Sequence, residues 1–234
     1  MSGSGESGYK RAGVDLDAAA RTMDLITREV ASTYTPGVLR GLGAFGGLFE
    51  LPAGMRRPVL AASTDGVGTK TVLARRYAAE HGVLEGIGRD LVNHCVNDVL
   101  VQGATPLFFL DYVASERLEP EVTARLVSGV AAACRQAGMA LLGGETAEMP
   151  GVYRQGEFDL AGTIVGVVER AAVVDGSRAR PGDAVLAFPS GGLQTNGFSL
   201  ARRALAGRFD DALSDGTPVW RALLAEHRSY LPAV

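Results

Sequence analysis

The chain has 234 residues, of which 47% are hydrophobic and 21% are charged, and its formal net charge is −3. This composition is typical of a globular protein with a sizeable core, in one large domain or two modest ones. The acidic balance and the lack of a basic cluster argue against a nucleic-acid-binding platform. No apolar run is long enough to cross a bilayer, so we expect neither a nucleic-acid nor a membrane partner.

The N-terminal residues and the cysteines indicate a compartment. Residues 1–8 are polar and glycine-rich, so we expect a flexible tail there, and nothing in it resembles a signal peptide. Cys95 and Cys134 lie in apolar, helix-like surroundings, which are typical of buried thiols in a reducing compartment. We therefore expect a cytoplasmic protein.

Apolar periodicity and turn signals predict alternating helices and strands, which is an α/β (α+β) pattern. In chain order we expect a helix at 14–33, a strand at 58–63, a helix at 67–79, a helix at 83–102, a strand at 107–113, a helix at 119–137, a strand at 139–142 and a strand at 158–169.

A second unit is predicted after a punctuated stretch, Arg-Ala-Arg-Pro-Gly-Asp, at residues 178–183. We expect a strand at 184–188 and helices at 196–206 and near 217–228. One strand and two helices cannot bury both faces of a sheet. We therefore expect this unit to be incomplete, to pack on the first domain, or to pair with a partner.

The sequence Thr-Asp-Gly-Val-Gly-Thr-Lys-Thr at residues 64–71 suits a magnesium-bound polyphosphate. Asp65 can offer hard oxygen to a cation, and Gly66 and Gly68 let backbone N–H groups approach an anion. Lys70 can place a positive charge against phosphate. The plain alternative is a strand-to-helix turn built from ordinary turn residues.

The helix predicted at 83–102 carries a polar arc. Its members fall on one side at 100° per residue: Asp90, Asn93, His94, Asn97 and Asp98. A polar arc is usually a solvated face, yet Asn and Asp disfavour a helix interior. A cation or polar ligand lying along the arc is the functional alternative.

A third acidic segment follows the predicted strand at 139–142, where Gly143 and Gly144 precede Glu145. Asp65, Asp98 and Glu145 each stand near the end of an element, where α/β folds gather ligands. Bound magnesium would offset their mutual repulsion, so the three are predicted metal ligands. For Glu148 we expect simple exposure.

Other motifs are weaker. Residues 41–46 spell G-x-G-x-x-G but follow a helix, so we reject a dinucleotide-binding motif there. The segment at 64–71 lacks the spacer of a Walker P-loop. His81, His94 and His227 are scattered, and no nucleophilic triad or zinc site is indicated.

Several segments, taken in order and spacing, resemble the phosphoribosylformylglycinamidine cyclo-ligases, the aminoimidazole ribonucleotide synthetases of purine biosynthesis. They are Tyr-Lys-Arg-Ala-Gly-Val-Asp at 9–15, the motif at 64–71, Cys-Val-Asn-Asp-Val-Leu-Val-Gln-Gly at 95–103, Pro-Leu-Phe-Phe-Leu-Asp-Tyr at 106–112, Gly-Gly-Glu-Thr-Ala-Glu-Met-Pro-Gly at 143–151 and Asp-Leu-Ala-Gly at 159–162.

This resemblance implies an ATP-dependent cyclisation of formylglycinamidine ribonucleotide to aminoimidazole ribonucleotide, with ATP and Mg²⁺ bound and ADP and phosphate released. The same superfamily includes selenophosphate synthetase and thiamine monophosphate kinase. It implies metal ligands at Asp65, Asp98 and Glu145, and catalytic roles for Lys70 and Asp65. The nucleotide-binding residues it implies are Asp65, Gly66, Gly68, Thr69, Lys70, Asn97, Asp98, Gly144 and Glu145.

The resemblance also implies an architecture. Residues 9–172 would form an N-terminal domain whose mixed sheet makes a β-barrel across a homodimer, and residues 173–234 would begin a C-terminal α/β domain. The family continues past residue 234 with a Thr-Gly-Gly-Gly segment, so we expect this second domain to be incomplete.

The second-domain loop departs from the family, which usually has a histidine where Gln194 stands. Glu226 stands where proline is common. Ser190, Thr195 and Asn196 could hold the substrate phosphate, and helix capping is the plain alternative for Thr195 and Asn196. Two further readings stay open: another phosphoryl transferase of the superfamily, and a shortened form that binds nucleotide without turnover.

Overall fold

The computed structural model describes residues 15–234. Its helices and strands, in chain order, are α2 (Leu16–Ala31), β1 (Val38–Arg40), β2 (Leu48–Phe49), β3 (Pro58–Gly66), α3 (Lys70–Arg76), α4 (Val83–Leu100), β4 (Thr105–Ser115), α5 (Pro120–Gln136), β5 (Ala140–Glu148), β6 (Phe158–Glu169), α6 (Phe198–Ala204) and α7 (Val219–Leu223). Every helix and strand predicted up to residue 169 is present. The short β1–β2 pair was not predicted.

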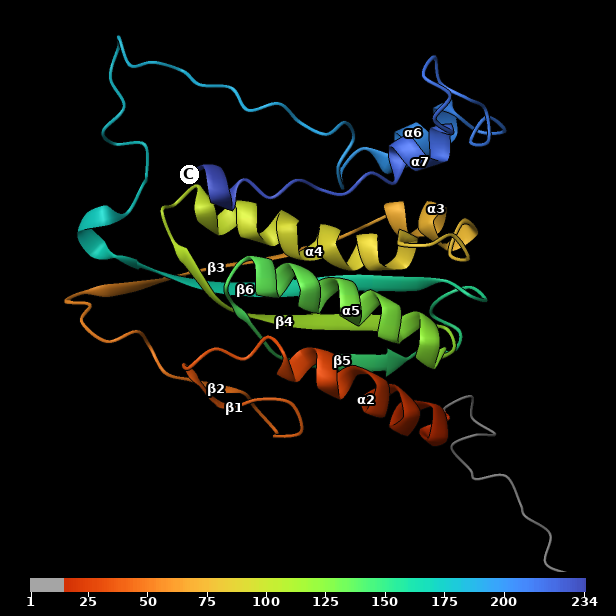
Figure 1. Ribbon diagram of the computed structural model, residues 1–234, viewed down its shortest axis with the longest axis horizontal. Helices are drawn as coiled ribbons and strands as arrows, with labels where there is room; N and C mark the ends of the chain where they lie inside the picture. Colours follow the sequence, from red (N-terminus) through yellow and green to blue (C-terminus); the bar gives the residue numbers. More distant parts are fainter. Residues whose placement is uncertain (1–14) are drawn as a thin grey trace, which may run out of the picture.

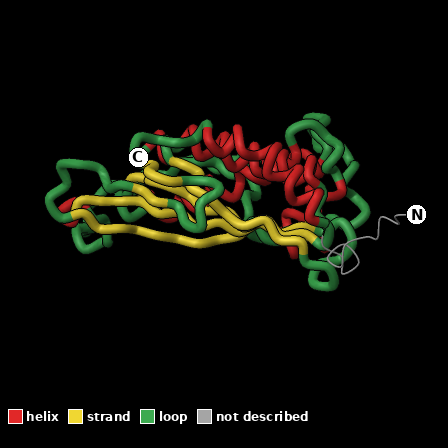
Figure 2. The backbone as a smooth tube through the Cα atoms, turned by 90° about the horizontal axis from the view of Figure 1, so that it is seen from below, coloured by secondary structure: helices red, strands yellow, loops and turns green. Residues whose placement is uncertain are grey.

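Four strands form a mixed sheet in the order β3-β6-β4-β5. β6 runs antiparallel to both β3 and β4, and β4 runs parallel to β5. Helices α2, α4 and α5 cover one face of the sheet, so the body has two layers (Figures 1 and 2). The predicted mixed α/β architecture is confirmed.

The helix layer is held by a close crossing of α4 and α5. A Cβ on Gly88 would lie 2.1 Å from the carbonyl oxygen of Leu126, and one on Gly129 would lie 1.9 Å from that of Glu85. Only glycine permits this backbone approach. Leu91 is fully buried beside the crossing, within the continuous apolar core.

The opposite face of the sheet is open. Leu60 on β3 is 57% exposed and Leu110 on β4 is 37% exposed. β3 and β5 form the two edges of this sheet. An uncovered apolar face with two unpaired edges is unusual for a stable monomer.

Three strands run further than predicted, and β4 extends at both ends, from Thr105 to Ser115. β3 continues through Asp65 and Gly66, and β5 continues through Gly144 to Glu148, because the long neighbouring strands keep pairing with them. Asp65 pairs with Gly162 in this register, and Gly144 pairs with Asp111. A Cβ on Gly144 would lie 2.0 Å from Oδ1 of Asp111, so glycine is needed there. Asp65 and Gly66, and the residues from Gly144 to Glu148, therefore belong to strands rather than to the loops that follow them.

The predicted strand at 184–188 is wrong. The described chain has no strand between residues 173 and 197, and Val185 and Leu186 are 95% and 81% exposed. An apolar segment becomes a strand only where another strand pairs with it, and none does here. The division of the chain at residue 173 stays a prediction.

The two predicted C-terminal helices are present but shorter than predicted. Helix α6 has seven residues, and helix α7 has five. They lie beyond α3 and α4, on the side of the helices away from the sheet (Figure 1). Cys95 and Cys134 are buried free thiols, as predicted, and burial raises the pKa of Cys95 to about 12. Within residues 15–234, no helix is long and apolar enough to cross a membrane.

Candidate functional site

Two of the three predicted metal ligands lie together. Asp65 stands near the end of β3, and Asp98 stands in the last turn of α4, which packs against β3. His94 lies one helical turn before Asp98 and joins them. One ligand atom from each of these side chains lies within 4.8 Å of the others. This Asp65–His94–Asp98 group is the acidic cluster of the site.

Each carboxylate in the cluster is held by one hydrogen bond. Oδ2 of Asp98 accepts from the hydroxyl of Ser63 at 2.6 Å, and Oδ1 of Asp65 accepts from the backbone N–H of Gly66 at 2.7 Å. Oδ2 of Asp65 lies 3.0 Å from Nε2 of His94. These contacts fix both side chains while leaving oxygens available for a cation.

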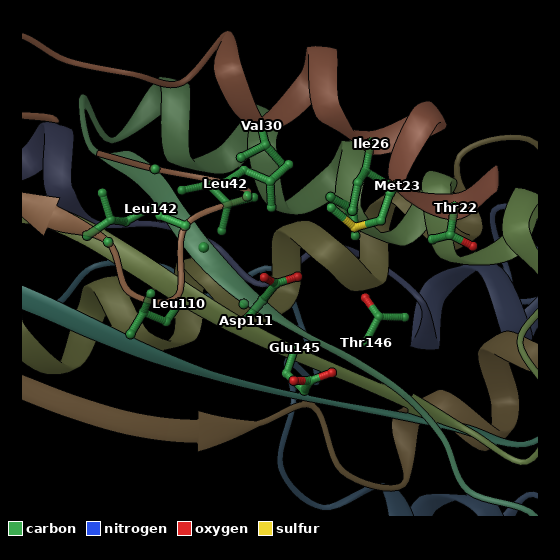
Figure 3. Close-up of a pocket in the computed structure, with 18 of the residues that line it drawn as sticks. Thr22, Met23, Ile26, Val30, Leu42, Leu110, Asp111, Leu142, Glu145 and Thr146 are labelled. Atoms are coloured by element: carbon green, nitrogen blue, oxygen red, sulfur yellow. The ribbon is translucent and has the colours of Figure 1, made fainter. Parts of the chain in front are cut away.

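Glu145 does not join the cluster within one chain, so the predicted three-carboxylate arrangement is corrected. Asp65 lies on edge strand β3 and Glu145 on the opposite edge, β5. Three strand spacings separate these edges by about 14 Å. Glu145 also alternates with Gly144 along the strand, so it faces the open side of the sheet, whereas Asp111 points into the helix side (Figure 3).

Lys70 occupies a buried ion pair. Its Nζ lies 2.6 Å from Oδ2 of Asp90, and it donates to the carbonyl of Ala225 at 2.7 Å. The ring centroid of Phe198 is 5.5 Å away. The ammonium group therefore meets a carboxylate rather than solvent. A contact between Lys70 and phosphate stays a prediction, and it would require this pair to open.

The polar arc of α4 is covered by the C-terminal segment at residues 225–230. Asp90 accepts from the backbone N–H of His227 at 2.6 Å, and Asn93 donates to the His227 carbonyl at 2.8 Å. Asn97 makes two more hydrogen bonds to the backbone of this segment, at 2.8 and 3.0 Å. The Asn and Asp residues inside the helix are thus compensated by a second segment of the chain. Neither a solvated face nor a ligand explains the first part of the arc.

Two histidines that are 133 positions apart meet at this segment. The rings of His94 and His227 stack with centroids 5.0 Å apart. Oγ1 of Thr195 lies 2.8 Å from Nδ1 of His94 and 3.3 Å from Nδ1 of His227. Burial, together with the neighbouring His94 ring and the Lys70 ammonium group, lowers the pKa of His227 to about 4, so its ring is neutral at physiological pH. No local pattern in the sequence indicates this meeting.

The glycines of the opening motif lie beside Asp65. Gly66 ends β3, and Gly68 has a φ of +66° with no atom within 4 Å of an added Cβ. The hydroxyl of Thr69 lies 3.0 Å from that of Ser199. The nucleotide-binding roles of Gly66, Gly68 and Thr69 stay predictions, and so do those of Asn97 and Gly144.

The predicted phosphate residues of the second loop do not converge. Ser190 bonds only to the backbone of Gly192, Thr195 is buried between the histidines, and Asn196 is exposed. The alternative of helix capping is wrong, because Gly197 is the N-cap of α6 and no side chain caps that helix. Their contact with a substrate phosphate stays a prediction.

A cavity of about 570 Å³ lies between α2, the loop at 41–47 and β5 (Figure 3). Residues 41–46, whose glycine-rich sequence does not form a dinucleotide-binding motif, line one side of the cavity. Asp111 points into it, and burial raises the pKa of this carboxyl to about 7. Glu145 and Thr146 also line the cavity. Sequence reasoning had not singled out Asp111 for a site.

The chain matches known proteins in sequence over most of its length. The model of the family described as "AIR synthase related protein, N-terminal domain" matches residues 52–168. A phosphoribosylformylglycinamidine cyclo-ligase of Picosynechococcus sp. is 54% identical over 84% of this chain and 57% of its own. One of Myxococcus xanthus is 52% identical over 97% of this chain and 66% of its own. The chain spans less than two thirds of these relatives.

Solved structures agree with the fold. A thiamine-monophosphate kinase from Stenotrophomonas maltophilia is 22% identical, with a TM-score of 0.55, and the match covers 79% of this chain and 52% of that one. The hydrogenase maturation protein HypE in complex with ATP is 23% identical, with a TM-score of 0.54, over 94% of this chain and 58% of that one. With half of its residues matched by the family model and cyclo-ligases among its relatives, the chain belongs to the AIR synthase related family.

Proposed function

We propose that this chain supplies the nucleotide-handling part of an ATP-dependent cyclo-ligase. The reaction closes formylglycinamidine ribonucleotide to aminoimidazole ribonucleotide and releases ADP and phosphate, in cytoplasmic purine biosynthesis. The observation that carries the proposal is the identity of 54% to a cyclo-ligase over 84% of the chain. The meeting of Asp65 and Asp98 supports it, because an ATP site needs anionic oxygens for a cation.

The residues of the cluster suit phosphoryl transfer to an amide oxygen. Magnesium on Asp65 and Asp98 would neutralise charge on the nucleotide phosphates. The backbone at Gly68 has open space beside it for an anion, and Thr69 adds a hydroxyl. Orienting the neighbouring nitrogen against the activated carbon then makes ring closure effectively unimolecular.

Lys70 differs from the other members of this set, because its charge is already paired with Asp90. We keep it as a proposed phosphate ligand that acts after the segment at 225–230 moves. Release of Ala225 and of the Asp90 pair would free its ammonium group. Activity of a variant that keeps the fold but lacks this charge decides the question.

We further propose that two copies of the chain pack through the open sheet face. Leu60 and Leu110 are exposed on it, and β3 and β5 are edge strands. Covering this face with a second copy would bury apolar area and satisfy the edges. Glu145 also lies on this face, so in a dimer it would meet residues of a second copy. Sedimentation equilibrium tests this proposal, and a stable monomer at micromolar concentration contradicts it.

Two alternatives remain distinct from the cyclo-ligase. The first is another phosphoryl transferase, since a thiamine-monophosphate kinase shares the fold; fold likeness at 22% identity does not favour it over relatives at 54%. The second is nucleotide binding without turnover.

The deciding experiment supplies purified chain with ATP, Mg²⁺ and formylglycinamidine ribonucleotide and measures aminoimidazole ribonucleotide. We expect the unaltered chain to form product and the Asp98→Asn variant to form none. Asp24→Asn, an exposed aspartate on α2, is the matched control and should retain full activity. Nucleotide binding without product would support the second alternative, and full activity in Asp98→Asn would remove Asp98 from the site.

A further inference from the structure

The cavity between α2, the loop at 41–47 and β5 contains a carboxyl group without a partner. Asp111 on β4 points into this cavity from the sheet (Figure 3). Among residues 15–234, no other residue donates a hydrogen bond to its carboxyl or forms an ion pair with it. Asp111 keeps partial exposure beside the cavity, yet the protein around it raises its pKa to about 7. An acid enclosed in this way costs stability unless a ligand supplies a partner.

The walls around the Asp111 carboxyl are mostly apolar. Ile26 and Val30 line the cavity from α2, and Leu142 lines it from β5 (Figure 3). The volume of about 570 Å³ is of the size that small-molecule sites usually have. Apolar walls around one polar group are also typical of such sites, because the polar group then fixes the orientation of the ligand.

Two glycines shape the cavity. A Cβ on Gly144 would lie 2.0 Å from Oδ1 of Asp111, so the missing side chain leaves the space that this oxygen occupies. A Cβ on Gly47 would lie 2.4 Å from Cγ of Leu142, so the end of the loop at 41–47 packs closely on the apolar wall. The loop therefore bounds the cavity, and the carboxyl stays accessible from inside it.

The charges around the cavity favour a cation. Asp111 and Glu145 line it, and none of its described lining residues is a lysine, an arginine or a histidine. A phosphate group placed inside would meet acidic side chains without a counter-charge, whereas a cation would be attracted to them. The cavity is therefore unsuited to the phosphates of a nucleotide and suited to a positively charged group.

We propose that this cavity binds the amidine group of the substrate, with the Asp111 carboxylate as its counter-ion. The inference rests on the proposed function, because formylglycinamidine ribonucleotide carries such a group. An amidine is protonated at neutral pH and presents two N–H donors in one plane. It can therefore donate to both oxygens of a carboxylate, as the guanidinium group of arginine does. The bound cation would keep Asp111 ionised.

The position of the cavity agrees with this assignment. Gly144 and Glu145, which are predicted nucleotide contacts, line the same cavity. The amidine end of the substrate would thus lie beside the predicted nucleotide contacts, and its own phosphate would stay outside the acidic cavity. Asp111 would orient the nitrogen that attacks in the proposed ring closure.

The test measures the binding of two simple probes to the full chain by isothermal titration calorimetry. Benzamidine carries an amidine on a flat apolar ring, and benzamide has nearly the same shape without the positive charge. We expect benzamidine to bind at least about tenfold more tightly than benzamide, because hydrogen bonds between charged groups are the stronger ones. Asp111→Asn should abolish this preference. Asp24→Asn, an exposed aspartate on α2, is the matched control and should keep it.

Equal affinity for the two probes overturns the inference, and so does an unchanged preference in Asp111→Asn. A measurement on the unaltered chain then locates the probe. Methyl groups of Ile26, Val30 and Leu142 line the cavity, so their nuclear magnetic resonance signals should shift when benzamidine is added. Signals that do not shift also overturn the inference.

The last measurement connects the cavity to the substrate. Formylglycinamidine ribonucleotide, added without ATP, should displace benzamidine from the unaltered chain, and failure to displace it overturns the inference. The result is separable from the product assay, because no step here uses ATP or turnover. Displacement without product would leave this site standing while the proposed activity fails. Product without displacement would overturn the site alone.

Discussion

The ammonium group of Lys70 lies 2.6 Å from a carboxylate oxygen of Asp90, and neither side chain is more than 1% exposed. Burial raises the pKa of Asp90 to about 6, against the lowering effect of Lys70. We expect Lys70→Met to reduce the free energy of unfolding by about 3–5 kcal/mol, because it leaves a buried carboxylate without its counter-charge. Urea denaturation measures this loss.

The double variant Lys70→Met/Asp90→Asn is the control for this pair. The amide of Asn keeps an acceptor for the His227 N–H and removes the charge, so most of the lost stability should return. A double variant no more stable than the single one would show that the lysine matters for another reason. If the double variant is stable but makes no product, the predicted catalytic role of Lys70 gains support.

Asp111 should make stability depend on pH. Its pKa rises from 3.8 to about 7 on burial, so between these values the folded chain binds more protons than the unfolded chain. Stability contributed by this group is therefore lost as pH rises from about 4 to 7. We expect Asp111→Asn to gain about 2 kcal/mol relative to the unaltered chain between pH 5 and pH 8. Denaturant unfolding at both pH values measures the gain.

The exposed Asp24→Asn serves as the matched control for Asp111, and its stability difference from the unaltered chain should stay nearly constant over the same range. A constant difference for Asp111→Asn as well would mean that the Asp111 carboxyl ionises normally in the cavity.

Gly88 and Gly86 on α4 should respond oppositely to alanine. A Cβ at Gly88 would lie 2.1 Å from the Leu126 carbonyl oxygen on α5, so Gly88→Ala must push the helices apart and should cost about 1–3 kcal/mol or more. At Gly86 the nearest atom is a side-chain carbon of Glu226 at 3.8 Å. Gly86→Ala should therefore gain about 0.5–1 kcal/mol from helix propensity. Thermal unfolding of both variants checks the opposite signs.

Thr195 should hold the two histidines through its hydroxyl. Thr195→Val keeps the shape but leaves ring nitrogens of His94 and His227 without a partner, and we expect a loss of about 1–3 kcal/mol. Thr195→Ser keeps the hydroxyl and should lose less than the valine variant. Equal losses in both variants would show that the methyl group, rather than the hydrogen bonds, stabilises this contact.

Local patterns were sufficient for much of the fold. The helix predicted at 83–102 is α4 at Val83–Leu100, and the strand predicted at 158–169 is β6 at Phe158–Glu169. Both have strong periodicity over many residues, which is the most reliable signal in a sequence. The segment at 184–188 has strand-like residues but no strand to pair with, and sequence alone does not show whether a partner is near.

The candidate site was predictable only where its residues carry a local signature. Asp65 stands out before two glycines, and Asp98 stands out on a polar arc. Asn93 and Asn97 also lie on that arc, but they form hydrogen bonds with the backbone of residues 227–230. A polar residue inside a helix needs compensation, but the sequence does not reveal which distant segment supplies it.

The amino-acid sequence by itself determined the order of helices and strands, the family and the acids that belong to its motifs, because these depend on spacing along the chain. Tertiary structure decided which of them meet. Strand register put Glu145 on the far edge and the open face of the sheet, whereas packing of α4 on β3 brought His94 to Asp65. Contacts between segments that are distant along the chain depend on how the layers pack, and no local pattern encodes them.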